Sequence, residues 1–356
     1  MSGRRLRVLH YAHQHGSGHV RHAATLIRAD VADVTVATAH PDAARLLPTG
    51  TRIVPLPTDI VPGHGQPEGS PLHHTPVGPA IQARFDALHD AARAVRPDVC
   101  VVDVSAEAAL FLRLAGYPVV HRRMHGDRTD PAHRLVYAEA DALFAHYGEV
   151  LEDPAWQAEF GARTAHLGVP DADGRLGRTA APARAGEAPR VVAVTGTGGG
   201  GVAAADLARA ARSTPGARWH VIGPVRDAGG ADLPENLELQ GWVEDVPAVL
   251  AAADVVVVSA GHNAAVDAAR SGRPVVLAPE ERPFAEQRRF AEAVERAAGV
   301  PWRAWEDPEA DWAGAVARAL GDPAAADRLA AALLRPPGEH AAGWGALLER
   351  AAASAQ

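Results

Sequence analysis

The feature of this sequence that most restricts its fold is a regular alternation between short apolar runs and longer segments rich in Ala, Leu and Arg. Runs such as Val99–Val104 and Val255–Ser259 are too short for buried helices, and their valine content is typical of buried strands. Strands that alternate with helices form βαβ units, and such units build parallel sheets. We therefore expect an α/β fold.

The same pattern predicts the individual elements. In the first half of the chain we expect strands at Leu6–Tyr11, Val34–Thr38, Ile53–Pro55, Val99–Val104 and Val119–His121, and helices at His19–Asp30, Asp42–Leu47, Ile81–Ala94 and Glu107–Ala115. In the second half we expect strands at Val191–Thr195, Trp219–Ile222, Leu237–Gln240, Val255–Ser259 and Val275–Ala278, and helices at Ala203–Arg212, Val246–Ala252, Ala264–Ser271 and Pro283–Ala298. Residues 62–79 are rich in Gly, Pro and His without periodicity, which predicts a long mobile loop.

The alternation is interrupted near the middle of the chain. Residues 170–189 carry Asp, Gly, Arg, Ala and Pro without a periodic apolar stripe, which is typical of a linker. We expect an N-terminal domain at residues 1–169 and a C-terminal domain at residues 190–338, both doubly wound and Rossmann-like, facing each other across a cleft. A helix at Trp344–Ala353, within residues 339–356, is expected to pack back on either domain, the N-terminal one included. Small ligands usually bind in such a cleft, at the carboxyl ends of the strands.

Composition excludes several classes of protein. The formal net charge of −8 argues against a general nucleic-acid binder, which would usually be basic. Cys100 is the single cysteine, so the chain can form no internal disulfide, and its apolar neighbours predict a buried thiol. No window approaches the roughly 18 successive apolar residues of a membrane span, and the first residues lack the apolar stretch of a signal peptide. We expect a cytoplasmic protein.

A small-residue turn in the second half has the properties of a phosphate site. A strand of valines leads into Ser259–Gly261, and a helix is predicted to follow. The free backbone N–H groups at the start of a helix, together with its dipole, bind anions. Asn263 can add a side-chain donor, and the carboxylate of Asp267, one turn further along, can accept from ribose hydroxyls. The arrangement suits a nucleotide diphosphate.

The run from Gly241 to Gln287 resembles the donor-binding region of glycosyltransferase families 1 and 28, the second of which includes the UDP-GlcNAc transferase that makes lipid II. The resemblance implies the GT-B fold, and it implies that an acidic residue six positions after the turn glycine binds the donor ribose. Asp267 stands at that spacing from Gly261, although many members have glutamate there. Several members of family 1 have histidine where this chain has Ser259, so family 28 is the better match.

Further donor contacts follow from the same resemblance. The acidic-Gln pair of the families, which contacts sugar hydroxyls, corresponds to Glu286 and Gln287, and the residues that face the base correspond to Trp242 and Val243. The complete implied donor site is Gly16, Gly18, Gly198, Gly199, Trp242, Val243, Ser259, Ala260, Gly261, His262, Asn263, Ala264, Asp267, Glu286 and Gln287. Each residue alone also fits a plain turn or a solvated helix face, and their common order and spacing favour the donor site.

The glycine-rich run Gly196–Gly201 also follows a predicted strand. It lacks the Lys-Ser/Thr ending of a P-loop and does not fit the dinucleotide-binding glycine pattern. In the families it resembles a second loop near the donor phosphates, through Gly198 and Gly199. The alternative is a turn in which small residues serve only the backbone.

A second motif follows the first predicted strand. Gly16 and Gly18 allow the backbone to turn sharply, and His19 then begins a helix at the rim of the cleft. An imidazole titrates near neutral pH, so His19 can take a proton from an acceptor hydroxyl. Families 1 and 28 have a similar Gly-rich loop ending in Gly-His. The alternative is a histidine that only caps the helix.

Asp103 is expected at the carboxyl end of its strand. In some family 1 enzymes an Asp in such a place orients the histidine base, whereas here Asp103 together with Ser105 also fits a cap of the next helix. His125 is a candidate contact for the acceptor. No Cys/His/Asp set has convincing metal-ligand spacing, so we expect neither a metal nor another resident cofactor.

The sequence therefore predicts an inverting, metal-independent glycosyltransferase that moves a hexose or aminosugar from a UDP- or dTDP-sugar to a small-molecule, natural-product or lipid-linked acceptor. One alternative is a UDP-sugar hydrolase, because Gly16–Arg21 also resembles the Gly-x-Gly-His-x-x-Arg motif of the hydrolase of pseudaminic acid synthesis. Another is a non-catalytic protein that binds nucleotide-sugars or a partner. The donor base, the acceptor, the oligomeric state and a peripheral membrane location stay open.

Overall fold

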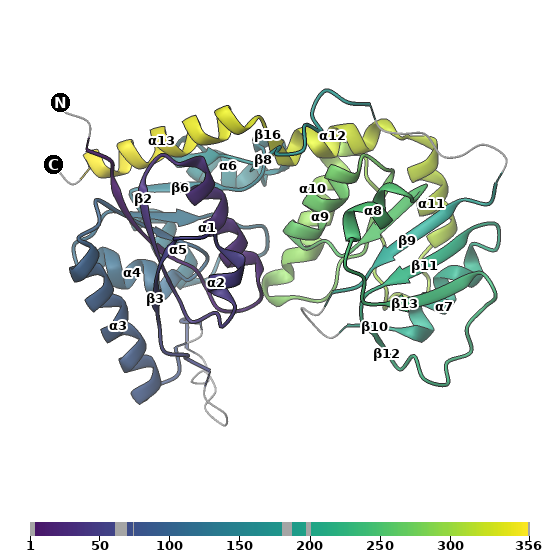
Figure 1. Ribbon diagram of the computed structural model, residues 1–356, viewed down its shortest axis with the longest axis horizontal. Coiled ribbons are helices and arrows are strands. Elements are labelled where there is room, and N and C mark those ends of the chain that lie inside the picture. Colours follow the sequence, from purple (N-terminus) through teal and green to yellow (C-terminus); the bar gives the residue numbers. More distant parts are fainter. Residues whose placement is uncertain (1–3, 61–69, 74, 180–186, 197–200, 355–356) are drawn as a thin grey trace.

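The computed structural model describes residues 4–60, 70–73, 75–179, 187–196 and 201–354. Its two lobes lie side by side, with the N-terminal half of the chain in one and most of the C-terminal half in the other (Figure 1). Each lobe contains a parallel sheet with helices on both faces. The expected pair of Rossmann-like α/β domains is confirmed.

The N-terminal sheet has seven parallel strands in the order β3-β2-β1-β4-β5-β6-β7. The strands are β1 (Arg7–Tyr11), β2 (Asp33–Thr38), β3 (Arg52–Pro55), β4 (Val99–Val102), β5 (Val119–Arg122), β6 (Ala142–Ala145) and β7 (Thr164–His166). The helices are α1 (Gly18–Ala29), α2 (Ala43–Leu46), α3 (Pro79–Val95), α4 (Ala106–Leu114), α5 (Pro131–Glu139) and α6 (Pro154–Phe160), with 3-10 turns η1 (Glu149–Leu151) and η2 (Gly161–Arg163). Residues 70–73 and 75–78 of the predicted loop are neither helix nor strand.

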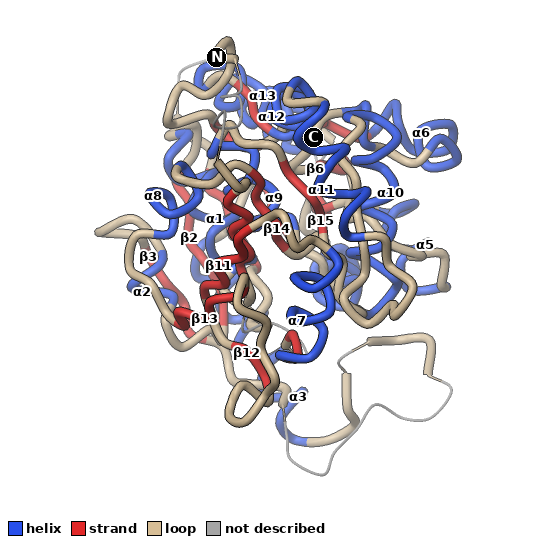
Figure 2. The backbone as a smooth tube through the Cα atoms, turned by 90° about the vertical axis from the view of Figure 1, so that its right-hand side faces the viewer, coloured by secondary structure: helices blue, strands red, loops and turns tan. Residues whose placement is uncertain are grey.

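The C-terminal sheet has five parallel strands in the order β13-β11-β9-β14-β15. They are β9 (Arg190–Val194), β11 (Arg218–Ile222), β13 (Leu237–Gly241), β14 (Val255–Val258) and β15 (Val275–Leu277). The helices are α7 (Ala204–Ser213), α8 (Val246–Ala251), α9 (His262–Ser271), α10 (Glu286–Ala298), α11 (Trp312–Gly321) and α12 (Ala324–Leu333), with the 3-10 turn η3 (Pro283–Ala285). Figure 2 views the molecule from the side of this domain, with strands enclosed by helices.

Alternate residues of the strands pack on opposite faces of each sheet, as the pleat requires. In the first sheet, Leu9 and Cys100 belong to the core beneath α3–α5, and Val8 and Val99 belong to the core on the other face. Because both faces of each sheet are buried, the strands are apolar at successive positions, which explains their valine-rich sequences.

The remaining elements are two short pairs of strands and one long helix. β8 (Val169–Pro170) pairs with β16 (Leu334–Arg335), and β10 (Val202–Ala203) pairs with β12 (Val225–Arg226). Helix α13 (Pro337–Ala353) begins seven residues before the predicted Trp344 and runs back along the N-terminal lobe (Figure 1). Its Trp344 is fully buried, with its ring centroid 4.9 Å from that of Phe144. The last helix therefore packs on the N-terminal lobe.

The prediction of a helix at residues 283–298 is wrong for its first three residues. Phe284 and Ala285 have φ angles of 62° and 51°, so the chain turns in the left-handed region before α10 begins at Glu286. Non-glycine residues adopt such angles only where their surroundings hold them. Gly126 of the N-terminal lobe packs against this turn, and the N–H of Asp127 donates to the Phe284 carbonyl at 2.7 Å. Among the described residues, no helix is long and apolar enough to cross a bilayer.

Candidate active site between the two domains

Three neighbouring strands place the polar side chains at the centre of the site. His19 follows β1 at the start of α1, Asp103 follows β4, and Arg122 ends β5. Because β4 lies between β1 and β5, the carboxyl ends of these strands bring the three residues together. His19 Nδ1 lies 2.7 Å from Asp103 Oδ2, and Arg122 Nη1 donates to Asp103 Oδ1 at 2.9 Å.

Of the two arrangements open to Asp103, the structure contains the pairing with His19. The cap of α4 is Ser105, whose hydroxyl accepts from the N–H of Ala108 at 3.2 Å. Asp103 is 1% exposed. Burial alone would raise the pKa of its carboxyl, but Arg122 and His19 hold that pKa well below the ordinary value. An ionised carboxylate beside an imidazole fixes the orientation and tautomer of the ring.

The turn between β14 and α9 approaches this group from the other domain. Gly261 is the N-cap of α9, which begins at His262, two residues before the predicted Ala264. A Cβ atom on Gly18 would lie 2.8 Å from Asn263 Nδ2, so the start of α1 lies close to the start of α9. The N-termini of two helices, one from each domain, therefore converge beside His19. Each N-terminus contributes N–H groups and a partial positive charge.

The structure places the remaining predicted donor residues at the same edge of the C-terminal sheet. Ser259 and the buried Ala260 form the turn before Gly261. The Asp267 side chain is 55% exposed and lies 3.8 Å from Arg270 Nη1. Trp242 follows β13 and is 80% exposed, so its indole is open to a ligand. Val243 beside it is half-buried.

Glu286 and Gln287 start α10 and have partners. Glu286 Oε2 accepts from Arg128 Nη2 of the N-terminal domain at 2.8 Å. Gln287 is buried, and its Oε1 accepts from the N–H of Glu280 at 2.9 Å. A Cβ atom on Gly261 would lie 3.7 Å from Gln287 Nε2, so Gln287 links the start of α10 to the turn that precedes α9.

A cavity of about 540 Å³ opens beside His19, within the size range of small-molecule sites. Side chains from both domains line it: His13, His15, His19, His73, Glu107, Met124, Arg128, His133, Arg282, Phe284, Glu286 and Gln287. The Phe284 ring lies 5.0 Å from those of His73 and His133, and Arg128 lies over it at 4.7 Å. The left-handed turn therefore presents an aromatic face to the cavity.

The glycines predicted to belong to the site have different structural roles. Gly16 has a φ of 71°, which glycine adopts without strain, and no atom lies within 4 Å of a Cβ built there. Gly18 is needed for the close approach to Asn263. Gly198 and Gly199 lie outside the described residues.

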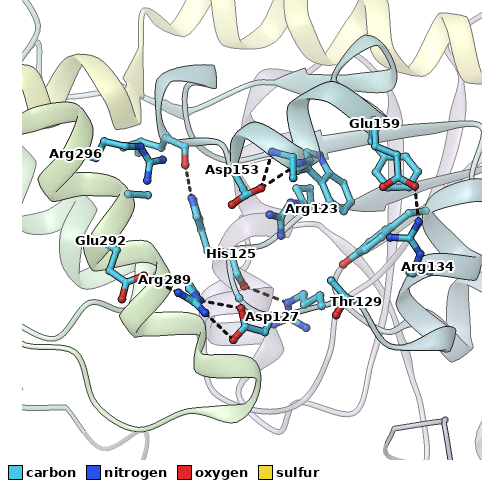
Figure 3. Close-up of a pocket in the computed structure, with 18 residues that line it drawn as sticks. Arg123, His125, Asp127, Thr129, Arg134, Asp153, Glu159, Arg289, Glu292 and Arg296 are labelled. Carbon is cyan, nitrogen blue, oxygen red and sulfur yellow. Dashed lines mark hydrogen bonds and ion pairs between the residues drawn. The ribbon is translucent and has the colours of Figure 1, made fainter.

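His125 does not line the cavity beside His19. It is buried, its Nε2 lies 2.7 Å from the Leu151 carbonyl oxygen, and its ring is 5.0 Å from that of Phe290 on α10. Burial lowers its pKa well below the ordinary histidine value. Figure 3 shows it in the wall of a second cavity of about 480 Å³, beside Arg296 and Asp127. A contact between His125 and an acceptor stays a prediction, and it would be made from this second cavity.

Histidines from both domains meet behind the His19–Asp103 pair. The rings of His22 and His146 stack at 4.2 Å, and Arg122 Nη2 lies 3.2 Å from His22 Nε2. His262 Nε2 lies 2.8 Å from the His146 carbonyl oxygen, and burial lowers the pKa of His262 to about 3. A neutral His262 can donate from Nε2, which holds the first residue of α9 against the N-terminal domain.

One histidine cluster has distances that metal ligands share: ring nitrogens of His73 and His133 and a carboxylate oxygen of Asp130 all lie within 4.8 Å of one another. Arg128 Nη1 lies 3.1 Å from His133 Nε2 and can only donate, so this nitrogen accepts and the hydrogen is on Nδ1. That Nδ1 lies 2.6 Å from Asp130 Oδ2. In this arrangement Nδ1 of His133 therefore holds a hydrogen, and it could ligate a metal only if Arg128 released Nε2.

Sequence reasoning missed Arg122 and Arg128. Arg122 has a recognisable signal, because a charged side chain that directly ends a buried strand must have a partner. The same signal identified Asp103. Arg128 has no comparable signal, since its partner Glu286 lies in the other domain, 158 positions away.

Comparison with solved structures identifies the architecture. The chain matches the spinosyn forosaminyltransferase with a TM-score of 0.65 at 18% identity, over 97% of this chain and 100% of that one. It matches MurG of Acinetobacter baumannii with a TM-score of 0.59 at 14% identity, over 93% and 97% of the two chains. It matches the spinosyn rhamnosyltransferase complexed with thymidine diphosphate with a TM-score of 0.57 at 19% identity, over 98% and 96%.

These structures define a class of fold, that of the two-domain GT-B glycosyltransferases. This chain has the GT-B fold over nearly its whole length, which confirms the fold implied by the sequence motifs. Scans of the sequence against family models and curated proteins found no match.

Proposed function

We propose that this protein is a glycosyltransferase that moves a hexose or aminosugar from a UDP- or dTDP-sugar to an acceptor hydroxyl, with inversion and without a metal ion or other resident cofactor. The observation that carries the proposal is the contact between the two halves of the site. The His19–Asp103 pair stands at the start of α1, and Gly18 of α1 touches Asn263 of α9. A base therefore lies beside a site suited to a diphosphate.

In the proposed reaction His19 is the general base. Its Nδ1 is held by Asp103, which leaves Nε2 to take the proton of the acceptor hydroxyl. The acceptor oxygen forms a bond to the anomeric carbon as the bond from that carbon to the diphosphate breaks. The leaving diphosphate takes the electron pair, and attack from the opposite face inverts the anomeric configuration.

The leaving group would be stabilised by α9. The N–H groups at its start and the amide of Asn263 would bind the diphosphate, with the positive end of the helix dipole in the role that a cation has in other enzymes. Asp267 would hold the ribose and Trp242 the base. The fold match to the rhamnosyltransferase complexed with thymidine diphosphate supports a nucleotide diphosphate as ligand.

Contacts to the donor sugar would come from Glu286 and Gln287. Glu286 is paired with Arg128 in this structure, so a sugar hydroxyl would share or replace that partner. The cavity of about 540 Å³ would hold the acceptor. Its aromatic and imidazole lining supports a small molecule or natural product, and a lipid-linked acceptor at a membrane surface is the alternative.

Donor binding is the direct test. Isothermal titration with UDP, UDP-GlcNAc and dTDP-glucose is expected to give a dissociation constant for at least one ligand, and absence of binding by folded protein would reject the proposal. Incubating protein and donor with candidate acceptors, followed by mass spectrometry, then identifies the product.

Two other functions remain outcomes of these experiments. A UDP-sugar hydrolase would release free sugar without an acceptor, at a rate comparable to full turnover. A non-catalytic nucleotide-sugar-binding protein would bind donor, and substitution of His19 would change no activity. The cavity beside His19 favours transfer, because water as acceptor needs far less room.

A further inference from the structure

The Asp103 carboxylate is shared between two partners on its two oxygens. His19 Nδ1 lies 2.7 Å from Oδ2, and Arg122 Nη1 lies 2.9 Å from Oδ1. The side chains of Asp103 and Arg122 are 1% and 4% exposed, so water contributes little to balancing either charge. A guanidinium is charged at every pH at which proteins are folded. The negative charge of Asp103 is therefore already balanced before His19 binds any proton.

Without Arg122 the same buried carboxylate would have His19 as its partner. A buried negative charge strongly favours a cation beside it, and an imidazole in contact with it would bind a proton. Protonated His19 has no lone pair with which to accept the proton of a hydroxyl. We propose that Arg122 is a positioning residue that keeps His19 unprotonated, and hence competent as a base, by balancing the charge of Asp103. This role rests on the proposed function of His19.

Arg122 also fixes the geometry of the pair. Its Nη2 donates to His22 Nε2 at 3.2 Å, and His22 lies one turn after His19 on α1. The two ends of one planar guanidinium thus hold the residue after β4 and the second turn of α1 in a fixed relation. His22 in turn stacks on His146, whose carbonyl oxygen accepts from His262 at the start of α9. The residue that sets the charge of the base is therefore connected to the proposed donor helix.

Of the described charged and titratable groups around His19 and Asp103, Arg122 is the one that balances the charge of the Asp103 carboxylate. The other groups are His10 on β1, His13 and His15 after it, His22 on α1, Glu107 on α4, His121 on β5, His146 after β6, His262 on α9, and the cavity residues His73, Arg128, His133, Arg282 and Glu286. Burial lowers the pKa of His10 to about 4 and that of His121 to about 3, so both are neutral at pH 7. Within the described part of the chain, Arg122 is the one arginine that contacts Asp103.

The experiment measures the protonation of His19 directly. Protein with isotope-labelled histidine is titrated by NMR between pH 5 and 9 without donor or acceptor, and the His19 signal is identified by its loss in His19→Asn. Arg122→Gln is expected to move the midpoint of this signal upward by about one pH unit or more, since removal of a cation within hydrogen-bond distance has an effect of that order. Arg122→Lys, which keeps the charge, is expected to move it by less than half of that shift.

Arg122→Met is a second neutral variant of similar volume. Asp103→Asn provides the opposite test, because it leaves Arg122 as the charge near His19 and should lower the midpoint. Unchanged midpoints in the folded variants, or an upward shift in Asp103→Asn, would overturn the proposal.

Activity supplies a second readout. The acid limb of the pH–rate profile should move upward in Arg122→Gln, with activity recovering at high pH, whereas a merely structural defect would lower the rate at every pH. Failure to bind any nucleotide-sugar would reject the proposed function while leaving the NMR result intact, so the two proposals can fail separately.

Discussion

His19 Nδ1 lies 2.7 Å from Asp103 Oδ2, although 84 positions separate the two residues in the sequence. The contact exists because β1 and β4 are neighbours at the centre of the N-terminal sheet and both end at the cleft. A histidine at the start of a helix can serve as a cap or as a base, and the buried carboxylate on its Nδ1 favours the base.

Replacing His19 by alanine should abolish turnover and preserve donor binding. General-base catalysis by one side chain contributes roughly 10²- to 10⁴-fold, and the proposed donor contacts belong to the other domain. Isothermal titration and steady-state rates of one preparation measure both quantities. Loss of donor binding with residual turnover intact would contradict the assignment.

Asp103→Asn should lower both activity and stability. An amide cannot enforce the same tautomer of His19, so we expect a loss of roughly 10²- to 10⁴-fold in kcat. The variant also leaves Arg122 buried beside a neutral group, which costs about 3–5 kcal/mol in the free energy of unfolding. Urea denaturation followed by circular dichroism checks the second effect, and a variant as stable as the wild type would show that the charge pair is dispensable.

Asp267→Ala should weaken donor binding by about tenfold, which is the effect of losing one hydrogen bond to a charged acceptor at an exposed site. Asp173→Ala is the matched control, because Asp173 is 69% exposed and lies 3.7 Å from the same Arg270. Equal donor affinities in the two variants would remove Asp267 from the site.

Gly18→Ala should impair donor binding with little effect on folding. The added methyl group would lie 2.8 Å from Asn263 Nδ2, and the flexible end of that side chain can move away without unfolding either domain. Gly321→Ala is the control, since no atom lies within 4 Å of a Cβ at that position. Melting temperatures near that of the wild type and a raised dissociation constant for Gly18→Ala alone are the expected result.

Stability should fall on mild acidification. Burial lowers the pKa of His10 to about 4, and those of His121 and His262 to about 3. Histidines of the unfolded chain bind protons below about pH 6.5, whereas these three histidines stay neutral in the folded protein. Acid therefore favours the unfolded state. This contribution to stability is therefore complete above about pH 6.5. It is lost progressively as the pH falls to about 4 for His10 and to about 3 for His121 and His262, on the order of 1 kcal/mol per pH unit for each histidine.

Urea midpoints between pH 7.5 and 5 measure this dependence. His10→Leu removes one of these groups, since neither ring nitrogen of His10 has a hydrogen-bond partner, and should reduce the slope by about one proton. A flat stability profile over this range would show that these histidines bind protons as readily in the folded protein as in the unfolded chain.

Several elements were predictable because their signals are local. Valine-rich strands such as β4 and β14 have a period and length that do not depend on distant residues. The start of α10 was not predictable in this way. Phe284 and Ala285 adopt left-handed backbone angles, and Gly126 of the other domain packs against that turn. The intrinsic preferences of Phe284 and Ala285 do not predict this backbone conformation, because it depends on packing against a loop that is distant in the sequence.

By itself, the sequence determined the α/β class, the two Rossmann-like domains and the order of the motifs along the chain, because strand and helix periodicities and turn residues act within a few positions. Only the tertiary structure decided which side chains meet. It showed that Asp103 contacts His19 and Arg122, paired Arg128 with Glu286 and placed His125 outside the cavity of His19. The physical reason is that these contacts depend on the order of strands in a sheet and on the packing of two domains. Both bring together residues that lie far apart along the chain, and a local sequence pattern contains no information about such pairs.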